Sequence, residues 1–177
     1  MRTVVIYKSK TGFVKKYAVW LAEELSADLF EASKFNIHQL NGYDKVIHGG
    51  SLHAVGIIGI KLITENMEKL EGKKVAVFAT GASPSSEAVI EEIITNNIPP
   101  DQRSKIKFFY LRGGFNYDKL PLGDKVLMTL LKWKITNKQK KKEELTRDER
   151  GMLAAYSKPV DFTKKDYINE IVEYVNS

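Results

Sequence analysis

The stretch "IYKSKTGFVKKYA", residues 6–18, joins a strand-like run to a helix-like run through four short polar or flexible residues. On the strand side, residues 2–7 are nearly all apolar and rich in β-branched side chains, as in a strand covered on both faces. On the helix side, apolar residues recur at helical spacing from 13 to 26, so one face of this helix is expected to be buried. The stretch therefore predicts a β-strand, a tight turn at 9–12 and an α-helix in direct succession.

The rest of the chain repeats this alternation of strand-like and helix-like runs. Further strands are expected at 27–32, 43–50, 73–81 and 104–114, and further helices at 56–70, 85–98 and 163–175. Strands that alternate with helices usually pair in parallel, because right-handed crossovers leave few other arrangements. The pattern predicts the α/β class, with a doubly wound sheet of five parallel strands.

The whole chain, 1–177, is expected to form a single domain, because 177 residues with 43% apolar content suffice for one full core. Residues 115–160 exceed an ordinary connection between a strand and a helix, and we interpret them as an insertion. The insertion holds an apolar helix at 124–135 and a charge run at 137–150. Within this run "KQKKKEEL" would be a solvated loop if the insertion packs on the chain's own sheet or forms a dimer contact.

Composition limits the chemistry that the chain can perform. There is no cysteine, which excludes disulfides, thiolate metal sites, iron–sulfur clusters and thiol catalysis. No apolar run is long enough to span a membrane, and the chain starts directly with a strand rather than a signal peptide, so we expect a cytoplasmic location. The net charge of +6 favours an anionic partner, with simple solubility as the alternative.

The carboxyl ends of four predicted strands are rich in glycine and hydroxyl side chains. These ends are 9–12, 49–56, 80–86 and 113–116. Because ligands of doubly wound sheets bind beyond the carboxyl ends of the strands, a polar ligand is expected at this edge. At the first end, hydroxyls, a glycine and a helix N-terminus together favour a phosphate group. The alternative is that Thr11 merely caps the helix and Gly12 eases the turn.

Other nucleotide and phosphate motifs are missing from the sequence. It has neither the G-x-G-x-x-G of dinucleotide sites nor the G-x-x-x-x-G-K-[ST] of nucleoside triphosphate sites. A receiver domain would need acidic residues after the first strand, where Tyr7 and Lys8 stand instead.

The first loop resembles the phosphate loop of the flavodoxin family, S/T-x-T-G-x-T. Residues 9–13 match its first five positions, and Val14 departs at the sixth. The resemblance implies a flavodoxin-like fold with strand order 2-1-3-4-5 and FMN as the cofactor. Loss of one charge-assisted hydrogen bond at position 14 would weaken FMN binding by roughly 1.5–3 kcal/mol. Val14 also begins the apolar stripe of the helix, so its side chain is expected to point into the core.

The same resemblance implies a set of cofactor-binding residues at the strand ends. They are Ser9, Lys10, Thr11, Gly12, Phe13, Val14, Ser51, Leu52, His53, Ala54, Thr80, Gly81, Ala82, Ser83 and Asn116. Among them His53 is expected to tune the flavin. Ser83 is alternatively a cap of the helix that follows, as are Ser85 and Ser86. No catalytic residue is assigned, because the flavin would perform the chemistry, and no metal site is expected. His48, inside the third strand, is expected to be a hydrogen-bonded core residue.

The order of motifs resembles that of the menaquinone-dependent protoporphyrinogen oxidases, which are flavodoxin-like proteins with an extra segment before the last helix. The matching stretches are "GGSLHAVG", "RGGFNYDK" and "DKVLMTLLKWKI". The resemblance implies an FMN-dependent oxidoreductase that oxidises a porphyrinogen and passes electrons to a quinone. Two alternatives stay open: a flavodoxin-type electron carrier, and a regulatory module that no longer binds FMN.

Much of the positive charge lies in residues 113–142, which hold eight lysines and two aspartates. Apolar residues of the 124–135 helix spread over about 200° of its circumference, which is more than a surface helix usually buries. An anionic membrane surface is therefore one partner that 119–142 could contact, at the inner face of the membrane. Packing onto the chain's own sheet, or formation of a homodimer, is the other interpretation. A nucleic-acid partner is not expected.

Overall fold

The computed structural model describes residues 1–141 and 143–177. The chain divides into two compact units. The first unit comprises Met1–Gly113 and Phe162–Ser177, and the second comprises Gly114–Asp161.

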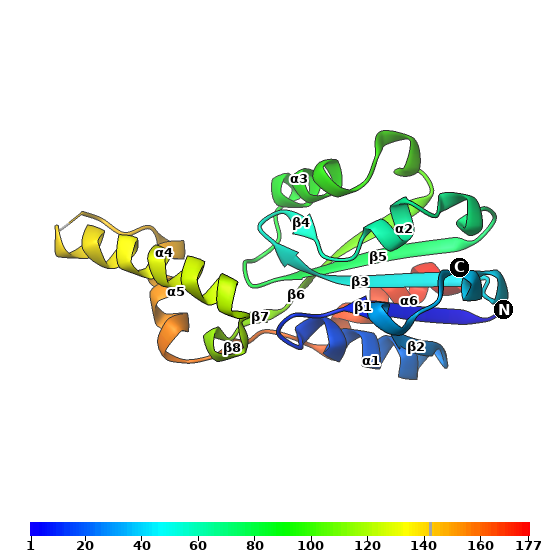
Figure 1. Cartoon of the computed structure of the whole chain (residues 1–177), viewed down its shortest axis with the longest axis horizontal. Helices are drawn as coiled ribbons and strands as arrows, with labels where there is room; N and C mark the ends of the chain where they lie inside the picture. Colours follow the sequence, from blue (N-terminus) through cyan, green and yellow to red (C-terminus); the bar gives the residue numbers. More distant parts are fainter. Residues whose placement is uncertain (142) are drawn as a thin grey trace. The chain divides into compact units, whose positions relative to one another are not determined.

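The first unit is built on a parallel sheet (Figure 1). Its five parallel strands are β1 (Thr3–Lys8), β2 (Asp28–Glu31), β3 (Lys45–His53), β5 (Lys74–Gly81) and β6 (Ile106–Arg112). They lie in the order β2-β1-β3-β5-β6, while the short β4 (Gly56–Ile57) pairs antiparallel with β3 outside this path. Without β4, this is the order 2-1-3-4-5 expected from the resemblance, so the predicted fold class is confirmed.

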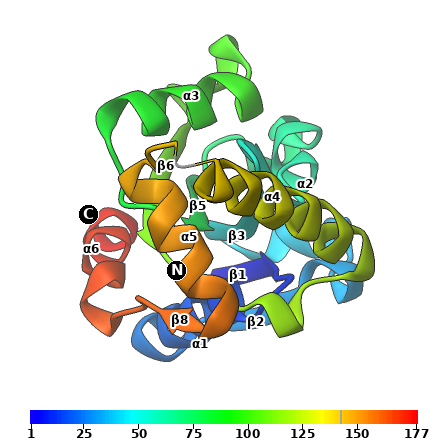
Figure 2. The same ribbon diagram turned by 90° about the vertical axis from the view of Figure 1, so that its left-hand side faces the viewer.

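Helices cover both faces of this sheet (Figure 2). On one face, α1 (Phe13–Leu25) and α6 (Asn169–Asn176), with the preceding 3-10 turn η6 (Lys165–Ile168), pack on Val5, Ile47 and Phe78. On the other face, α3 (Glu87–Asn97) and the loops after β4 pack on Val4, Val46 and Val77. The sheet residues alternate between the two cores because successive side chains of a strand point to opposite faces.

The remaining elements of the first unit are short turns of helix. They are η1 (Ala32–Lys34), η2 (Ile37–Gly42), α2 (Lys61–Thr64), η3 (Met67–Leu70) and η4 (Pro100–Gln102). The helix predicted at 56–70 is therefore wrong: this segment contains β4, one turn of α-helix and one 3-10 turn. Gly59 interrupts the segment with a left-handed φ of +86°, a conformation that glycine adopts readily. Ile57, Ile60 and Ile63 are nonetheless buried, so burial alone produced the helix-like spacing.

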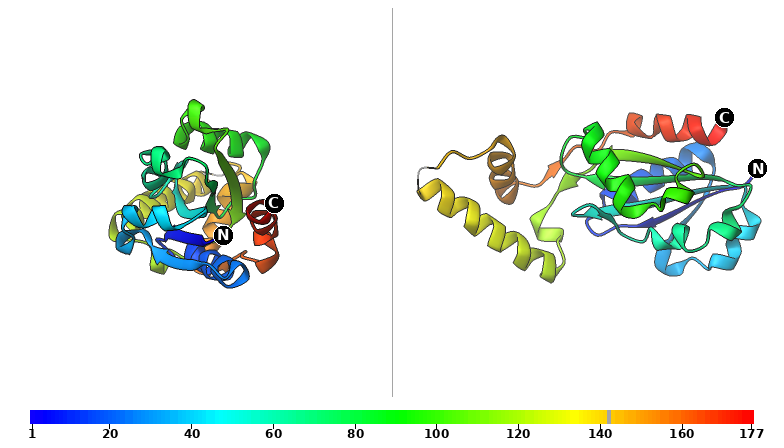
Figure 3. Two further views of the ribbon diagram at one scale, coloured as in Figure 1. Left: turned by 90° about the vertical axis from the view of Figure 1, so that its right-hand side faces the viewer. Right: turned by 90° about the horizontal axis from the view of Figure 1, so that it is seen from above.

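In its described residues, the second unit contains α-helices and a small two-stranded sheet (Figure 3). Its elements are β7 (Gly114–Phe115), η5 (Tyr117–Lys119), α4 (Leu122–Lys140), α5 (Arg147–Ser157) and β8 (Val160–Asp161). The helix predicted at 124–135 exists and is longer. The solvated loop predicted from "KQKKKEEL" is wrong at its start, because Lys138 to Lys140 continue α4, and Lys142 lies outside the described residues.

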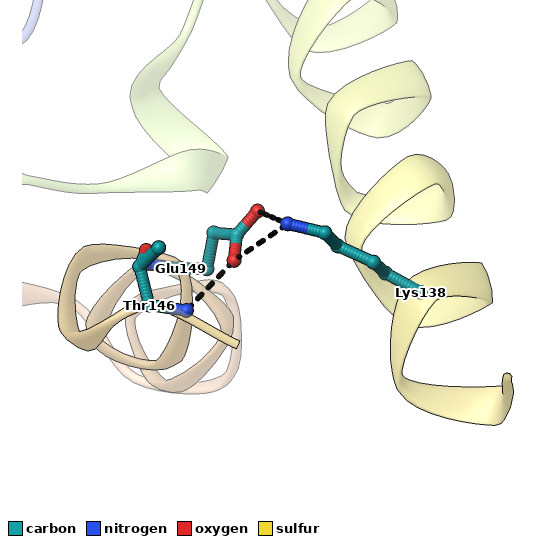
Figure 4. Close-up of polar contacts among 3 residues, drawn as sticks. All are labelled: Lys138, Thr146 and Glu149. Carbon is teal, nitrogen blue, oxygen red and sulfur yellow. Dashed lines mark hydrogen bonds and ion pairs between the residues drawn. The ribbon is translucent and has the colours of Figure 1, made fainter. Parts of the chain in front are cut away.

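The helix α5 was missed in the sequence because its first turn is made of charged residues. Its N-terminus is set by a capping box, in which Thr146 Oγ1 accepts from the Glu149 N–H and Glu149 accepts from the Thr146 N–H. Glu149 also forms an ion pair with Lys138 of α4 at 3.0 Å (Figure 4). These charges therefore start a helix and join it to its neighbour.

Candidate functional site

The turn from β1 into α1 has a glycine at the N-cap. Gly12 has φ +97°, and no described side chain caps the helix that follows. Thr11 is therefore not the cap that the alternative interpretation required. Inside the turn, Ser9 Oγ accepts a hydrogen bond from the Gly12 N–H at 3.0 Å. The result is a helix N-terminus whose first amides are free of a competing side-chain cap, with two hydroxyl residues in the preceding turn.

Ser51, at the end of β3, holds this turn in place. The Lys10 N–H donates to Ser51 Oγ at 3.1 Å, and Ser51 is almost fully buried. The β1 turn and the β3 end, 41 residues apart in sequence, are therefore joined by one hydrogen bond. Ser51 positions the first loop, a role that sequence reasoning did not give it.

The ends of β5 and β6 meet the start of α1 at Gly113. A Cβ atom at Gly113 would lie 3.2 Å from Thr80 Cβ and 3.4 Å from Phe13 Cβ, so a side chain here would require the neighbouring residues to shift slightly. The Gly113 N–H donates to the Gly81 carbonyl at 2.8 Å. The structure thus brings residues of two predicted strand ends next to the first residue of α1, as expected for the carboxyl edge of a parallel sheet.

Two side chains of β6 hold the loop after β5. The Tyr110 hydroxyl donates to the Ser83 carbonyl at 2.7 Å, and Arg112 Nε donates to the Ala82 carbonyl at 3.4 Å. Burial raises the pKa of Tyr110, so this hydroxyl keeps its proton for the hydrogen bond. Neither residue was predicted from sequence, because the contacts join positions about 30 residues apart. Of the three serines expected as possible caps of α3, Ser86 is confirmed, because its Oγ accepts a hydrogen bond from the Val89 N–H at 3.3 Å, and Ser83 is not the cap.

A family model described as a flavodoxin domain matches residues 4–143 of the chain, more than half of its length. This chain belongs to the flavodoxin domain family. Among curated proteins, no sequence relative matches it.

Solved flavodoxin structures show a weak structural likeness to this flavodoxin-domain chain. A WrbA-like flavodoxin from Agrobacterium tumefaciens is 17% identical, with 70% of this chain and 87% of that chain covered and a TM-score of 0.49. Oxidised flavodoxin 1 from Bacillus cereus is 17% identical, with 71% and 90% covered and a TM-score of 0.47. Two-electron reduced flavodoxin from Megasphaera elsdenii is 16% identical, with 68% and 89% covered and a TM-score of 0.44.

The second predicted cofactor loop of this flavodoxin domain is a β-hairpin. β3 continues to His53 and pairs with β4, with Leu52 opposite Ile57, where the sequence predicted that the strand ended at residue 50. Asn97 of α3 holds the hairpin through two side-chain hydrogen bonds: it accepts from the Ile57 N–H at 2.7 Å and donates to the Val55 carbonyl at 2.6 Å. The side chain of His53 is exposed at the hairpin end. Its role beside a flavin stays a prediction.

Asn116 lies in the second unit, unlike the other predicted cofactor residues. Its side chain caps the η5 turn, accepting from the N–H groups of Asp118 at 3.1 Å and Lys119 at 3.4 Å. That capping is a local structural role, and a contribution of Asn116 to cofactor binding stays a prediction.

The residues of the first unit fit a phosphate monoester at the β1 turn. Apart from Gly12 and its chain neighbours, no described residue has an atom within 4 Å of the position that a Gly12 Cβ would take, and the first turn of α1 holds two lysines and no acidic residue. Backbone amides at a helix N-terminus and hydroxyls bind phosphate well without an arginine. Within the described part of the chain, no cluster of side chains is arranged to hold a metal ion. The geometry of the β1 turn fits a phosphate group.

Val14 is fully buried against Tyr17, Ala18 and the sheet, which confirms that it points into the core. Replacing Val14 by threonine places a hydroxyl in that core, which is expected to cost about 1–3 kcal/mol in the free energy of unfolding. Chemical denaturation measures this loss, with Val14→Ala as the control for lost volume. FMN affinity of the folded Val14→Thr protein is expected to be no weaker than that of the parent. Weaker binding would mean that the turn is not shaped as described.

Proposed function

We propose that this flavodoxin-domain chain binds FMN at the carboxyl edge of its sheet and acts as an oxidoreductase. The observation that carries the proposal is the uncapped N-terminus of α1 at Gly12, next to Ser9 and Thr11 and joined through Ser51 to the next strand end. When bound, FMN supplies the electron-transfer chemistry, and the chain supplies binding and orientation. The α1 amides and turn hydroxyls would hold the phosphate, and the hairpin carrying Leu52 and His53 would border the ring.

The proposed substrate is a hydrophobic, anionic molecule such as a porphyrinogen, with a quinone as the electron acceptor. The net charge of +6 favours an anionic substrate. The order of motifs, which resembles the menaquinone-dependent protoporphyrinogen oxidases, also supports this choice. A flavodoxin-type electron carrier is the second candidate. Its partner would have to carry a negative surface, because this chain is basic.

Flavin binding is tested by titrating the chain with FMN and, separately, with riboflavin, which lacks the phosphate. We expect Thr11→Ala and Ser9→Ala each to weaken FMN binding about 10- to 100-fold, because each removes a hydroxyl from the proposed phosphate site. Riboflavin affinity should change little. Flavin fluorescence quenching measures both constants, and Thr95→Ala, which removes an exposed hydroxyl on α3, is the matched control.

Equal losses for FMN and riboflavin would place the phosphate elsewhere. Absence of any flavin binding would favour a regulatory module over an oxidoreductase. For the FMN-loaded protein, anaerobic oxidation of protoporphyrinogen that depends on an added menaquinone analogue is the result expected of the proposed reaction. Efficient one-electron exchange with a reductase, without that oxidation, would favour the electron carrier.

A further inference from the structure

The apolar surface of α4 consists of two separate faces. Met128, Leu131 and Ile135 lie on one side of the helix, and Ile135 is only 3% exposed. The other face is solvent-exposed although it is built of large apolar side chains. It consists of Leu122 (82% exposed), Val126 (62%), Leu130 (60%) and Trp133 (66%), which we call the exposed α4 face. Leu127 (57%) is also exposed and lies about 60° beyond Leu130 on the helix. At 100° per residue these four positions fall within about 80° of the helix circumference.

The partner of the first face is α5, as its contacts show. Tyr156 of α5 donates its hydroxyl proton to the Met128 carbonyl, and Lys132 lies over the Tyr156 ring at 5.2 Å. The ion pair between Lys138 and Glu149 joins the two helices nearer the end of α4 (Figure 4). These contacts come from Met128, Lys132 and Lys138, none of which belongs to the exposed α4 face. The exposed α4 face is therefore not the surface that α5 covers.

The lysines around the exposed α4 face indicate what covers it. Residues 113–142 carry eight lysines and two aspartates, so the net charge of this segment equals the +6 of the whole chain. Lys125 and Lys134 lie on opposite flanks of the exposed face by helical position, and both are one residue from one of its members. An apolar strip with a tryptophan and flanking lysines matches an anionic lipid surface, where the strip enters the acyl boundary and the lysines meet lipid phosphates.

We propose that the exposed α4 face binds an anionic lipid bilayer, with α4 lying along the membrane surface. Among the helices that the structure describes, none is long and apolar enough to cross a membrane. A single protein surface that is both apolar and basic fits a bilayer better than a second copy of this chain, because two copies would bring like-charged flanks together. The inference does not depend on FMN, since the residues that carry it lie on α4.

The test is binding of the full chain to vesicles, followed by co-sedimentation. We expect binding to vesicles of mixed phosphatidylcholine and phosphatidylglycerol, much weaker binding to pure phosphatidylcholine, and a decline with rising salt. Equal binding to both vesicle types would overturn the electrostatic part of the proposal. In a Trp20→Phe background, the fluorescence of Trp133 should shift to shorter wavelength on binding. An unchanged spectrum would place another surface at the membrane.

Matched variants separate the face from bulk charge. Lys125→Gln/Lys134→Gln should weaken binding to the mixed vesicles at least tenfold, whereas Lys105→Gln/Lys107→Gln, with the same net charge, should have little effect. Val126→Ser/Leu130→Ser should weaken it about 100-fold without loss of fold, because these side chains are already exposed. If the Val126→Ser/Leu130→Ser chain binds vesicles normally, and light scattering shows a dimeric parent but a monomeric variant, the face is a self-association surface and the proposal fails.

Discussion

Replacing Gly50 by alanine is expected to destabilise the first unit by about 3 kcal/mol and to displace the hairpin that follows β3. A Cβ at Gly50 would lie 2.5 Å from Ile57 Cγ2 and 2.6 Å from the Ile58 carbonyl oxygen. The carbonyl belongs to the backbone, and Ile57 is buried, so neither atom moves cheaply. Forcing extra volume into a packed site typically costs 1–3 kcal/mol and sometimes more.

The neighbouring Gly49 faces the opposite core and gives a second case of the same kind. Its Cβ would lie 2.2–2.8 Å from three atoms of the fully buried Phe78 ring. We expect Gly49→Ala to be destabilising as well, and Phe78→Leu to recover part of the loss when it is combined with Gly49→Ala. Only the Gly50 change should also alter flavin binding, because only Gly50 contacts the hairpin.

Urea denaturation and FMN titration measure the two effects. Gly42→Ala is the control, because its Cβ would meet only Arg2 Nη1 at 3.6 Å, an ordinary contact. A Gly50→Ala protein as stable as the parent would contradict the packing of the hairpin against β3. These contacts explain the pair of glycines in the sequence: one makes room for a ring and the other for a backbone carbonyl.

Replacing His48 by leucine is expected to remove much of the loss of stability between pH 6.5 and pH 4. His48 is fully buried in β3, and within the described structure neither ring nitrogen has a hydrogen-bond partner. The prediction that His48 lies in the core is therefore confirmed, and the prediction that its ring is hydrogen-bonded is wrong. The Ile58 carbonyl is near enough to favour the protonated ring but does not meet hydrogen-bond geometry.

The pKa of His48 is lowered from 6.5 to about 4: burial is the main cause, the backbone of Ile58 opposes the shift, and the charge of Lys8 adds to it. Between these two pH values the unfolded chain takes up a proton on this ring and the folded chain does not. Unfolding is therefore increasingly favoured as the pH falls, and the free energy of unfolding drops by about 3 kcal/mol across the window. Above pH 6.5 both states are neutral, so this group has no effect there.

The difference in unfolding free energy between parent and His48→Leu, measured at several pH values, isolates this titration from that of the carboxylates. At pH 7 the variant should be as stable as the parent or more so, since an unpaired buried polar group is replaced by an apolar one. As the pH falls to 4, the free energy of unfolding of the variant should rise relative to that of the parent. His38→Gln, which changes a histidine outside the core, is the control. Parallel pH profiles for parent and His48→Leu would mean that the ring is not buried in its neutral form.

The sequence alone determined the features that depend on local periodicity. The buried β-strand at the start, the turn at 9–12 and the helix after it follow from apolar spacing over a few residues. The same holds for the other four parallel strands and for α3 with its serine cap. Because crossover handedness allows few arrangements of such elements, a parallel doubly wound sheet and the edge where a ligand would bind followed as well, whereas the strand order came from the resemblance to flavodoxins.

Only the tertiary structure decided the features that depend on contacts between distant residues. Apolar residues at 57–70 are buried by packing and not by a helix, a distinction that spacing alone cannot make. The supports of the candidate site, Ser51, Asn97, Tyr110 and Arg112, act through hydrogen bonds to segments about 30 to 42 residues away. The wide apolar arc of α4 likewise became two faces once α5 was seen to cover one of them.

Residues 6–18 show most clearly which features are local and which need the folded chain. Its sequence predicted a turn suited to phosphate and a Val14 that points inward, because both follow from the chain within a few residues. That the turn leaves the amides of α1 without a side-chain cap, and that a buried serine 41 residues away holds it in place, required the folded sheet. Local periodicity specifies elements, whereas the shape of a site is set where the ends of those elements meet.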